Sequence, residues 1–213
     1  MFIELLDLLR CINVHEETWL VASLKAISNR FVLDGTLGCP VCHAEYRIKK
    51  GIADFTQTGE LVRESLEPSP PSGNREEVAT RVGAFLNATE PGATLVLGGS
   101  WAEAAQELSV MTATRILALN PSKQEESETV GLLRVNREIP LAPASVLGVA
   151  LDASFAPEII SSALKVVRAG GRIVAPAEIE PPGELAVLAR DERYWVGEKP
   201  AEMISLRRSR ISE

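Results

Sequence analysis

The spacing of apolar and polar residues divides the chain into two unlike regions. After residue 74, segments with apolar residues at helical spacing alternate with short continuous apolar runs, and glycine or proline often stands between them. Helix and strand patterns that alternate in this way predict a layered α/β domain with a mainly parallel sheet. Before residue 56 the apolar runs are shorter and show no such alternation.

The larger region begins with a plain helix signal. Asn74 and Glu77 are spaced for a capping box, and Val78, Val82 and Leu86 follow along one helix face with Phe85. Pro91-Gly92 ends this helix. The later patterns predict strands at residues 93–97, 115–119, 131–135, 146–151 and 172–175, helices at 100–108, 156–167 and 184–189, and a closing antiparallel pair at 193–196 and 203–207.

The apolar pattern of the smaller region fits either a helix or strands. Leu20, Leu24 and Ile27 are spaced for a helix face, although the strands of a small ribbon could use the same residues. Residues 30–33 lead into Asp34-Gly35 and predict a strand that enters a turn. Residues 56–74 combine several prolines with glycine and no apolar period, which predicts an exposed linker. We therefore expect domains at residues 1–55 and 75–213, joined by a linker at 56–74.

Composition and charge exclude several classes of protein. Hydrophobic residues make up 46% of the chain, yet no apolar run reaches the length of about 20 residues that a membrane helix needs. Glu4 and Asp7 stand where a secretory signal would carry positive charge, so we expect a cytoplasmic protein. The 29 acidic residues outnumber the 22 basic ones, for a net charge of −7, which argues against a nucleic-acid partner.

All cysteines and histidines fall in the smaller region, where a core of some 55 residues would gain from a metal. Cys39-Pro40-Val41-Cys42 is a tight turn that directs two thiolates to one point, and Cys11 with His15 offers two further ligands. These four residues predict a closed structural zinc site without an open position for water. The alternative is that the cysteines are free thiols or small buried residues. His43 is expected to lie in solvent.

These residues also carry a resemblance to a known family. The segments LLDLLRC at residues 5–11 and LGCPVCHAEYRIKKGIADF at 37–55 resemble the Trm-one-one-two-like zinc-ribbon family, the activator subunits of tRNA, rRNA and release-factor methyltransferases. In place of the family's first Cys-Pro-x-Cys, this chain has Cys11 followed by His15. The resemblance implies a small zinc ribbon that pairs with a methyltransferase by extending its sheet. Here the ribbon would dock on its own C-terminal region, or remain free for another protein or a second copy.

The larger region resembles class I S-adenosylmethionine-dependent methyltransferases. The segment LKVVRAGGRIVAP at residues 164–176 and the order of elements carry this likeness, which implies a Rossmann-like, doubly wound sheet with an antiparallel C-terminal hairpin. It also implies cofactor contacts at Gly98 and Gly99, in the turn after the first strand, and at Asn120, where the family has an acidic residue. No catalytic tetrapeptide stands after the fourth strand, where this chain reads Asp152-Ala153-Ser154-Phe155, so we expect no catalytic residue.

Three functions follow from these patterns. The first is a non-catalytic binding or accessory protein that combines an activator-like zinc ribbon with a degenerate methyltransferase-like domain. The second is a working methyltransferase with a built-in activator, and the third is a nucleic-acid-binding ribbon. Asp152 either caps the following helix or lies near a ligand, and Trp101 and Trp195 are expected to pack in the core. The altered cofactor motif favours the first function, and we expect weak or absent binding of S-adenosylmethionine.

Overall fold

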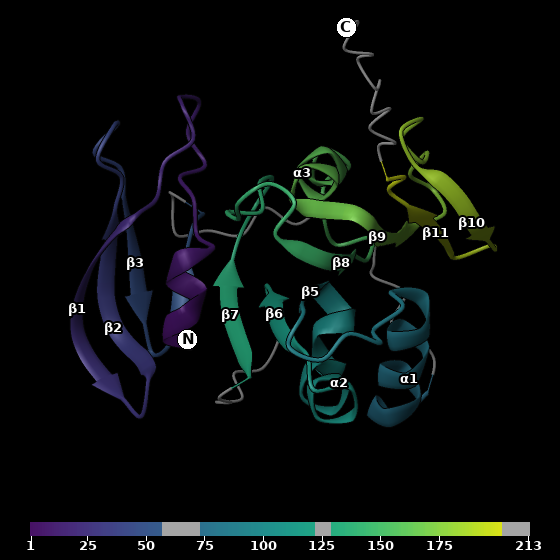
Figure 1. Ribbon diagram of the computed structural model, residues 1–213, viewed down its shortest axis with the longest axis horizontal. Coiled ribbons are helices and arrows are strands. Elements are labelled where there is room, and N and C mark those ends of the chain that lie inside the picture. The colour runs from purple at the N-terminus through teal and green to yellow at the C-terminus, as the bar shows by residue number, and fades with distance from the viewer. Residues whose placement is uncertain (57–72, 122–128, 202–213) are drawn as a thin grey trace, which may run out of the picture.

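The structure, a computed structural model, describes residues 1–56, 73–121 and 129–201. Its strands form one eleven-stranded mixed sheet in the order β1-β2-β3-β4-β7-β6-β5-β8-β9-β11-β10. The sheet runs through both regions of the chain, with the first four strands at one end (Figure 1). Helices lie on both of its faces, which confirms the predicted α/β class.

The first four strands form an antiparallel meander. On β3, buried Tyr46 and Ile48 alternate with exposed neighbours, as expected of a sheet with one face on the core. The bounds are β1 Val21–Ser28, β2 Phe31–Gly38, β3 Glu45–Lys49 and β4 Ile52–Asp54.

The helix predicted from Leu20, Leu24 and Ile27 is wrong, because these residues belong to β1 or directly precede it. The pairing of β1 with β2 shifts register twice between Leu24 and Ile27, so the apolar spacing departs from the strict period of two. The turn predicted at Asp34-Gly35 is also wrong, since β2 continues through it. A Cβ on Gly35 would lie 2.7 Å from the carbonyl oxygen of Ser23, so this glycine permits close strand approach.

The larger region supplies a parallel sheet with an antiparallel end. Strands β7, β6, β5, β8 and β9 run parallel to one another. Strand β11 is antiparallel to β9, and β10 is antiparallel to β11. The strands predicted at residues 93–97, 115–119, 131–135 and 146–151 are confirmed to within about one residue. The bounds are β5 Thr94–Gly98, β6 Arg115–Leu119, β7 Val130–Arg134, β8 Val146–Ala150, β9 Val167–Pro176, β10 Ala186–Arg190 and β11 Tyr194–Glu198.

Two predictions near the C-terminal end are wrong. Residues 184–189 were expected to be helical, yet residues 186–190 form the edge strand β10, whose side chains are all exposed. Strand β9 begins at Val167 and continues through Gly170-Gly171, whereas we expected a strand only from residue 172. Tyr194–Glu198 is a strand as predicted, but its hairpin partner is β10, and the predicted strand at 203–207 lies outside the described residues.

The helices cover the sheet from both sides, with α1 and α2 on one face and α3 on the other (Figure 1). The capping box of Asn74 and Glu77 is confirmed. The helix predicted at residues 100–108 begins as a short 3₁₀ helix at Gly99, whose start no side chain caps, and continues as α2. The bounds are η1 Ile3–Asp7, α1 Arg75–Phe85, η2 Gly99–Ala104, α2 Ala105–Thr112 and α3 Ile159–Val166.

The core has two parts, one on each face of the sheet. The part under α1 and α2 includes Trp101, which is fully buried as predicted. The other part includes Trp195, also fully buried, and it joins residues of both regions, among them Leu5, Tyr46 and Leu119. The smaller region therefore shares its apolar core with the larger one.

The two regions also join through their backbones, at a set of contacts that we call the junction. Strand β4 pairs with β7 in parallel, and Phe55 N–H continues the ladder by donating to Arg134 O at 2.8 Å. On the sheet face that carries α3, Arg10 N–H donates to Pro140 O at 2.9 Å, and Leu9 bridges to Leu141. The N-terminal region thus docks on the C-terminal region of the same chain.

The predicted linker at 56–74 lies almost wholly outside the described residues. Among the described helices, none is long and apolar enough to cross a membrane.

Candidate functional site

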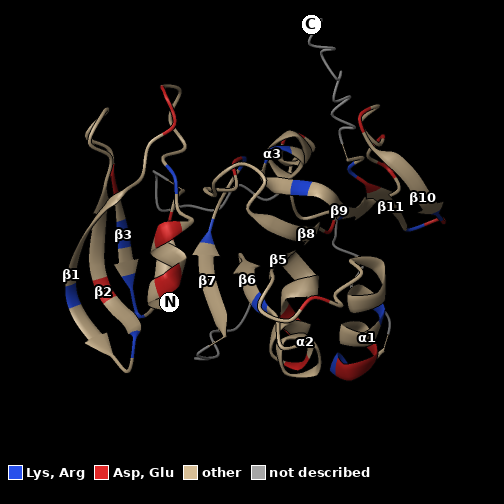
Figure 2. Ribbon diagram, in the orientation of Figure 1, with Lys and Arg blue, Asp and Glu red and all other residues tan. Residues whose placement is uncertain are grey.

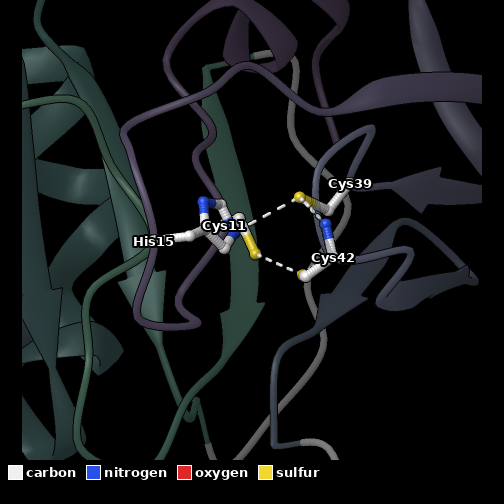
Figure 3. Close-up of side chains that lie close together, drawn as sticks. All are labelled: Cys11, His15, Cys39 and Cys42. Atoms are coloured by element: carbon white, nitrogen blue, oxygen red, sulfur yellow. Dashed lines mark hydrogen bonds between the residues drawn. The ribbon is translucent and has the colours of Figure 1, made fainter.

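The four residues predicted to bind zinc come together at one end of the ribbon (Figure 3). Cys11 and His15 lie in the segment between η1 and β1, and Cys39 and Cys42 lie in the turn that joins β2 to β3. Their ligand atoms all lie within 4.8 Å of one another. Cys11 Sγ is 3.6 Å from Cys42 Sγ, and Cys39 Sγ is 3.4 Å from His15 Nε2. His43 is exposed, as expected.

This donor set fits a zinc ion. In a tetrahedral site with Zn–S bonds of about 2.3 Å, two sulfur ligands stand about 3.8 Å apart, close to the observed separation of Cys11 and Cys42. Three thiolates and one imidazole complete four-coordinate zinc and leave no open position for a reactive water. Such an ion would supply a cross-link between the two loops and no catalytic chemistry.

The surroundings of the sulfur atoms differ. The backbone amide of Ala44 lowers the pKa of Cys42 to about 6, and Asn13 Nδ2 adds a hydrogen bond to its Sγ at 3.3 Å. Burial raises the pKa of Cys11. The carbonyl of Glu16 accepts from His15 and raises the pKa of that imidazole. Cys42 is therefore the ligand best prepared to bind as a thiolate.

Sequence reasoning did not give Tyr46 a role at this site beyond its place in the family pattern. Its hydroxyl lies 3.2 Å from Cys11 Sγ and accepts from Ile12 N–H at 3.4 Å. Tyr46 is 1% exposed, and burial raises the pKa of its phenol. A protonated phenol that faces a sulfur ligand is the kind of outer contact that orients metal ligands.

A second candidate site lies at the carboxyl ends of the parallel strands. The strand order reverses at β5, which has β6 on one side and β8 on the other. In open α/β sheets, ligands bind in the crevice at such a switch point. The predicted cofactor contacts Gly98 and Gly99 end β5 and begin η2, and Asn120 follows β6 directly. The fold therefore brings the three residues to the same edge.

The carboxylate of Asp152 occupies this edge. One of its oxygens accepts from Ser100 N at 2.6 Å and Ser100 Oγ at 2.7 Å, and the other accepts from the backbone and side chain of Ser154. Asp152 is 1% exposed. Gly99, at φ 64°, has no Cβ, and one placed there would overlap the carboxylate. Asp152 makes no cap for α3, whose N-cap is Glu158, so the capping alternative is wrong.

The other predicted contacts are also engaged within the chain. Asn120 Nδ2 donates to Val135 O at 2.8 Å, and Asn120 Oδ1 accepts from Val135 N at 2.9 Å. Phe155 packs so closely on Gly98 that a Cβ there would lie 2.7 Å from its ring. The Asn120 side chain and the Ser100 amide thus already have partners within the chain, and in this arrangement they do not fit S-adenosylmethionine.

No family model and no curated protein matches the sequence. Among solved structures, the chain is similar to a methyltransferase of an antibiotic biosynthesis pathway from Anabaena variabilis, with 17% identity, a TM-score of 0.41 and coverage of 47% of this chain and 44% of that one. It thus spans less than half of that methyltransferase.

Two further solved structures give somewhat higher scores. A complex of the Trm112 methyltransferase activator of Haloferax volcanii with a methyltransferase matches at 14% identity and a TM-score of 0.46, over 60% of this chain and 91% of that one. An S-adenosylmethionine-dependent methyltransferase from Methanococcus maripaludis matches at 10% identity and a TM-score of 0.46, over 61% of this chain and 87% of that one. All these scores lie below 0.5, so the fold class rests on the strand order itself.

Proposed function

We propose that this chain is a non-catalytic accessory protein, in which a zinc ribbon of activator type supports a methyltransferase-like domain that no longer uses its cofactor. One observation carries the proposal: the buried Asp152 carboxylate takes up the donors at the switch point. A protein of this kind acts by binding another protein or by stabilising a complex. Under this proposal the chain has no catalytic residue, in keeping with residues 152–155, where no catalytic tetrapeptide stands.

The chemistry of cofactor binding supports the loss of this activity. The resemblance to class I methyltransferases implies backbone donors in the glycine turn and an acid that holds the ribose. Here Asp152 accepts from one backbone donor of this turn, the N–H of Ser100. The acid is replaced by Asn120, whose side chain bonds to Val135. Each lost charge-assisted hydrogen bond costs roughly 1–3 kcal/mol, or about ten- to a hundredfold in affinity. Two such losses raise a micromolar dissociation constant toward millimolar.

The junction supports an intramolecular role for the ribbon. The resemblance implies that an activator ribbon extends the sheet of a separate methyltransferase, and in this chain β4 extends the chain's own sheet at β7. The outward edge of the ribbon is β1, which would be the strand that remains for a protein partner or a second copy. Acidic and basic residues are interspersed along the described chain (Figure 2), which does not favour a nucleic-acid partner.

The alternative function is an S-adenosylmethionine-dependent methyltransferase with its activator built in. The switch point between β5 and β8 favours it, because this is where such a sheet binds ligands. Under this alternative, Gly98, Gly99 and Asn120 hold the cofactor, and Asp152 moves aside when it binds.

Asn120→Asp separates these functions. The variant restores the acid that the methyltransferase family uses, but it also places a carboxylate oxygen beside Val135 O in place of a donor. We expect it to lower the free energy of unfolding by about 1–3 kcal/mol. We also expect S-adenosylmethionine to leave its thermal midpoint unchanged, because a ligand that binds only the folded state would raise it. A rise in the midpoint with the cofactor would contradict the proposal.

A further inference from the structure

Tyr46 lies between the candidate metal site and the junction. Its hydroxyl contacts Cys11 Sγ at 3.2 Å, and its ring stacks on Phe55, with centroids 4.5 Å apart and an angle of 27° between the planes. Both aromatic residues are 1% exposed. One side chain therefore contacts a predicted metal ligand with its polar end and the junction with its ring.

Phe55 is itself part of the junction. Its backbone N–H donates to Arg134 O at 2.8 Å, just beyond the three residue pairs that join β4 to β7. Beside it, Asp54 forms an ion pair with Arg134 at 3.5 Å. A shift of the Tyr46 ring would therefore disturb the packing of the residue that ends the parallel ladder.

A second connection runs through Cys11. The residue before it, Arg10, donates its backbone N–H to Pro140 O, and Ala142 donates to Leu8 O at 2.9 Å. Tyr46 accepts from Ile12, the residue after Cys11. The loop that carries Cys11 is thus attached to the larger region on one side and to Tyr46 on the other.

From these contacts we infer that Tyr46 is a positioning residue that couples metal binding in the ribbon to the pairing of β4 with β7. The inference rests on the metal site proposed above and does not depend on whether the larger region binds S-adenosylmethionine. Its hydroxyl fixes Cys11 for the metal, and its ring transmits that fixed position to Phe55. Metal binding then stabilises strand β7 as well as the ribbon.

Tyr46→Phe in the full chain tests this inference, with Co²⁺ as the probe. The variant keeps the ring and its stack on Phe55 but removes the hydroxyl. We expect the Co²⁺ affinity, measured by competition with a chelator, to fall about ten- to a hundredfold, the usual effect of losing an outer contact to a ligand. The thiolate-to-cobalt charge-transfer band should shift, because the hydrogen bond to Cys11 Sγ is gone. If Tyr46 acted through packing alone, the Co²⁺ affinity and the charge-transfer band would both stay unchanged.

Hydrogen exchange measures the coupling. In the unaltered protein, Co²⁺ should slow amide exchange in β7, and this gain should be smaller in Co²⁺-saturated Tyr46→Phe. Phe55→Leu serves as a second variant, with unchanged Co²⁺ affinity and charge-transfer band but a smaller gain in β7. The inference would be overturned if Tyr46→Phe kept the Co²⁺ affinity of the unaltered protein. It would also be overturned if Co²⁺ did not change amide exchange in β7 of the unaltered protein. If Tyr46→Phe does not fold, the unaltered protein and Phe55→Leu still decide it.

Discussion

Replacing Cys39 with serine should remove the bound metal and unfold the N-terminal ribbon. Cys39 is 3% exposed and lies in the tight turn with Cys42, so the change removes a buried thiolate ligand from the better-formed half of the site. Structural zinc contributes roughly 10–16 kcal/mol in zinc-finger peptides at neutral pH, and we expect a loss of stability of at least about 4 kcal/mol here. Elemental analysis of protein prepared without chelator, with urea unfolding followed by circular dichroism, measures both effects.

His15→Ala is the matched control. His15 is only half-buried and contributes the imidazole of the less regular pair, so its loss should lower metal content and stability less than the loss of Cys39 does. The unaltered protein should contain one zinc ion per chain. A zinc content near zero with an intact circular dichroism spectrum would rule out the site.

Asp152→Ala should destabilise the larger region by about 4 kcal/mol or more. The change leaves the amides and hydroxyls of Ser100 and Ser154 without their acceptor. These four donors are part-buried, and each one left unpaired costs about 1 kcal/mol, the lower end of the usual range. The same measurement of urea unfolding gives the difference.

Asp152→Asn controls for shape. An asparagine keeps one acceptor oxygen in nearly the same volume, so we expect about half of the loss seen with alanine. If Asp152→Ala were within about 0.5 kcal/mol of the unaltered protein, the carboxylate would be an ordinary surface group and would not close the switch point.

Local signals predicted much of the larger region. The buried runs at β5, β6 and β8 are short and continuous, which is typical of a parallel sheet covered on both faces, and the capping box at Asn74 needs only residues close in sequence. The edge strand β10 carries no such signal, because its side chains are all exposed and its structure depends on β11. Edge strands are set by their neighbours more than by their own pattern.

The candidate sites were likewise predicted only where local sequence patterns define them. The spacing of Cys11, His15, Cys39 and Cys42 was enough to predict one metal site, because zinc limits both the types of its ligands and their spacing. The contact of Tyr46 with Cys11 crosses 35 positions, and that of Ser100 with Asp152 crosses 52, so no local pattern shows them. Asp152 and Ser154 do fit the pattern of an Asx turn, which could have favoured a local role for Asp152.

Calorimetric titration of the unaltered protein with S-adenosylmethionine tests the central claim most directly. Asp152 holds the amide of Ser100 and Val135 holds the side chain of Asn120, so we predict no saturable heat at about 300 µM cofactor, well below a dissociation constant near millimolar. Saturable binding in the micromolar range would contradict the account. It would make the chain a methyltransferase candidate, with Gly98, Gly99 and Asn120 as its cofactor contacts.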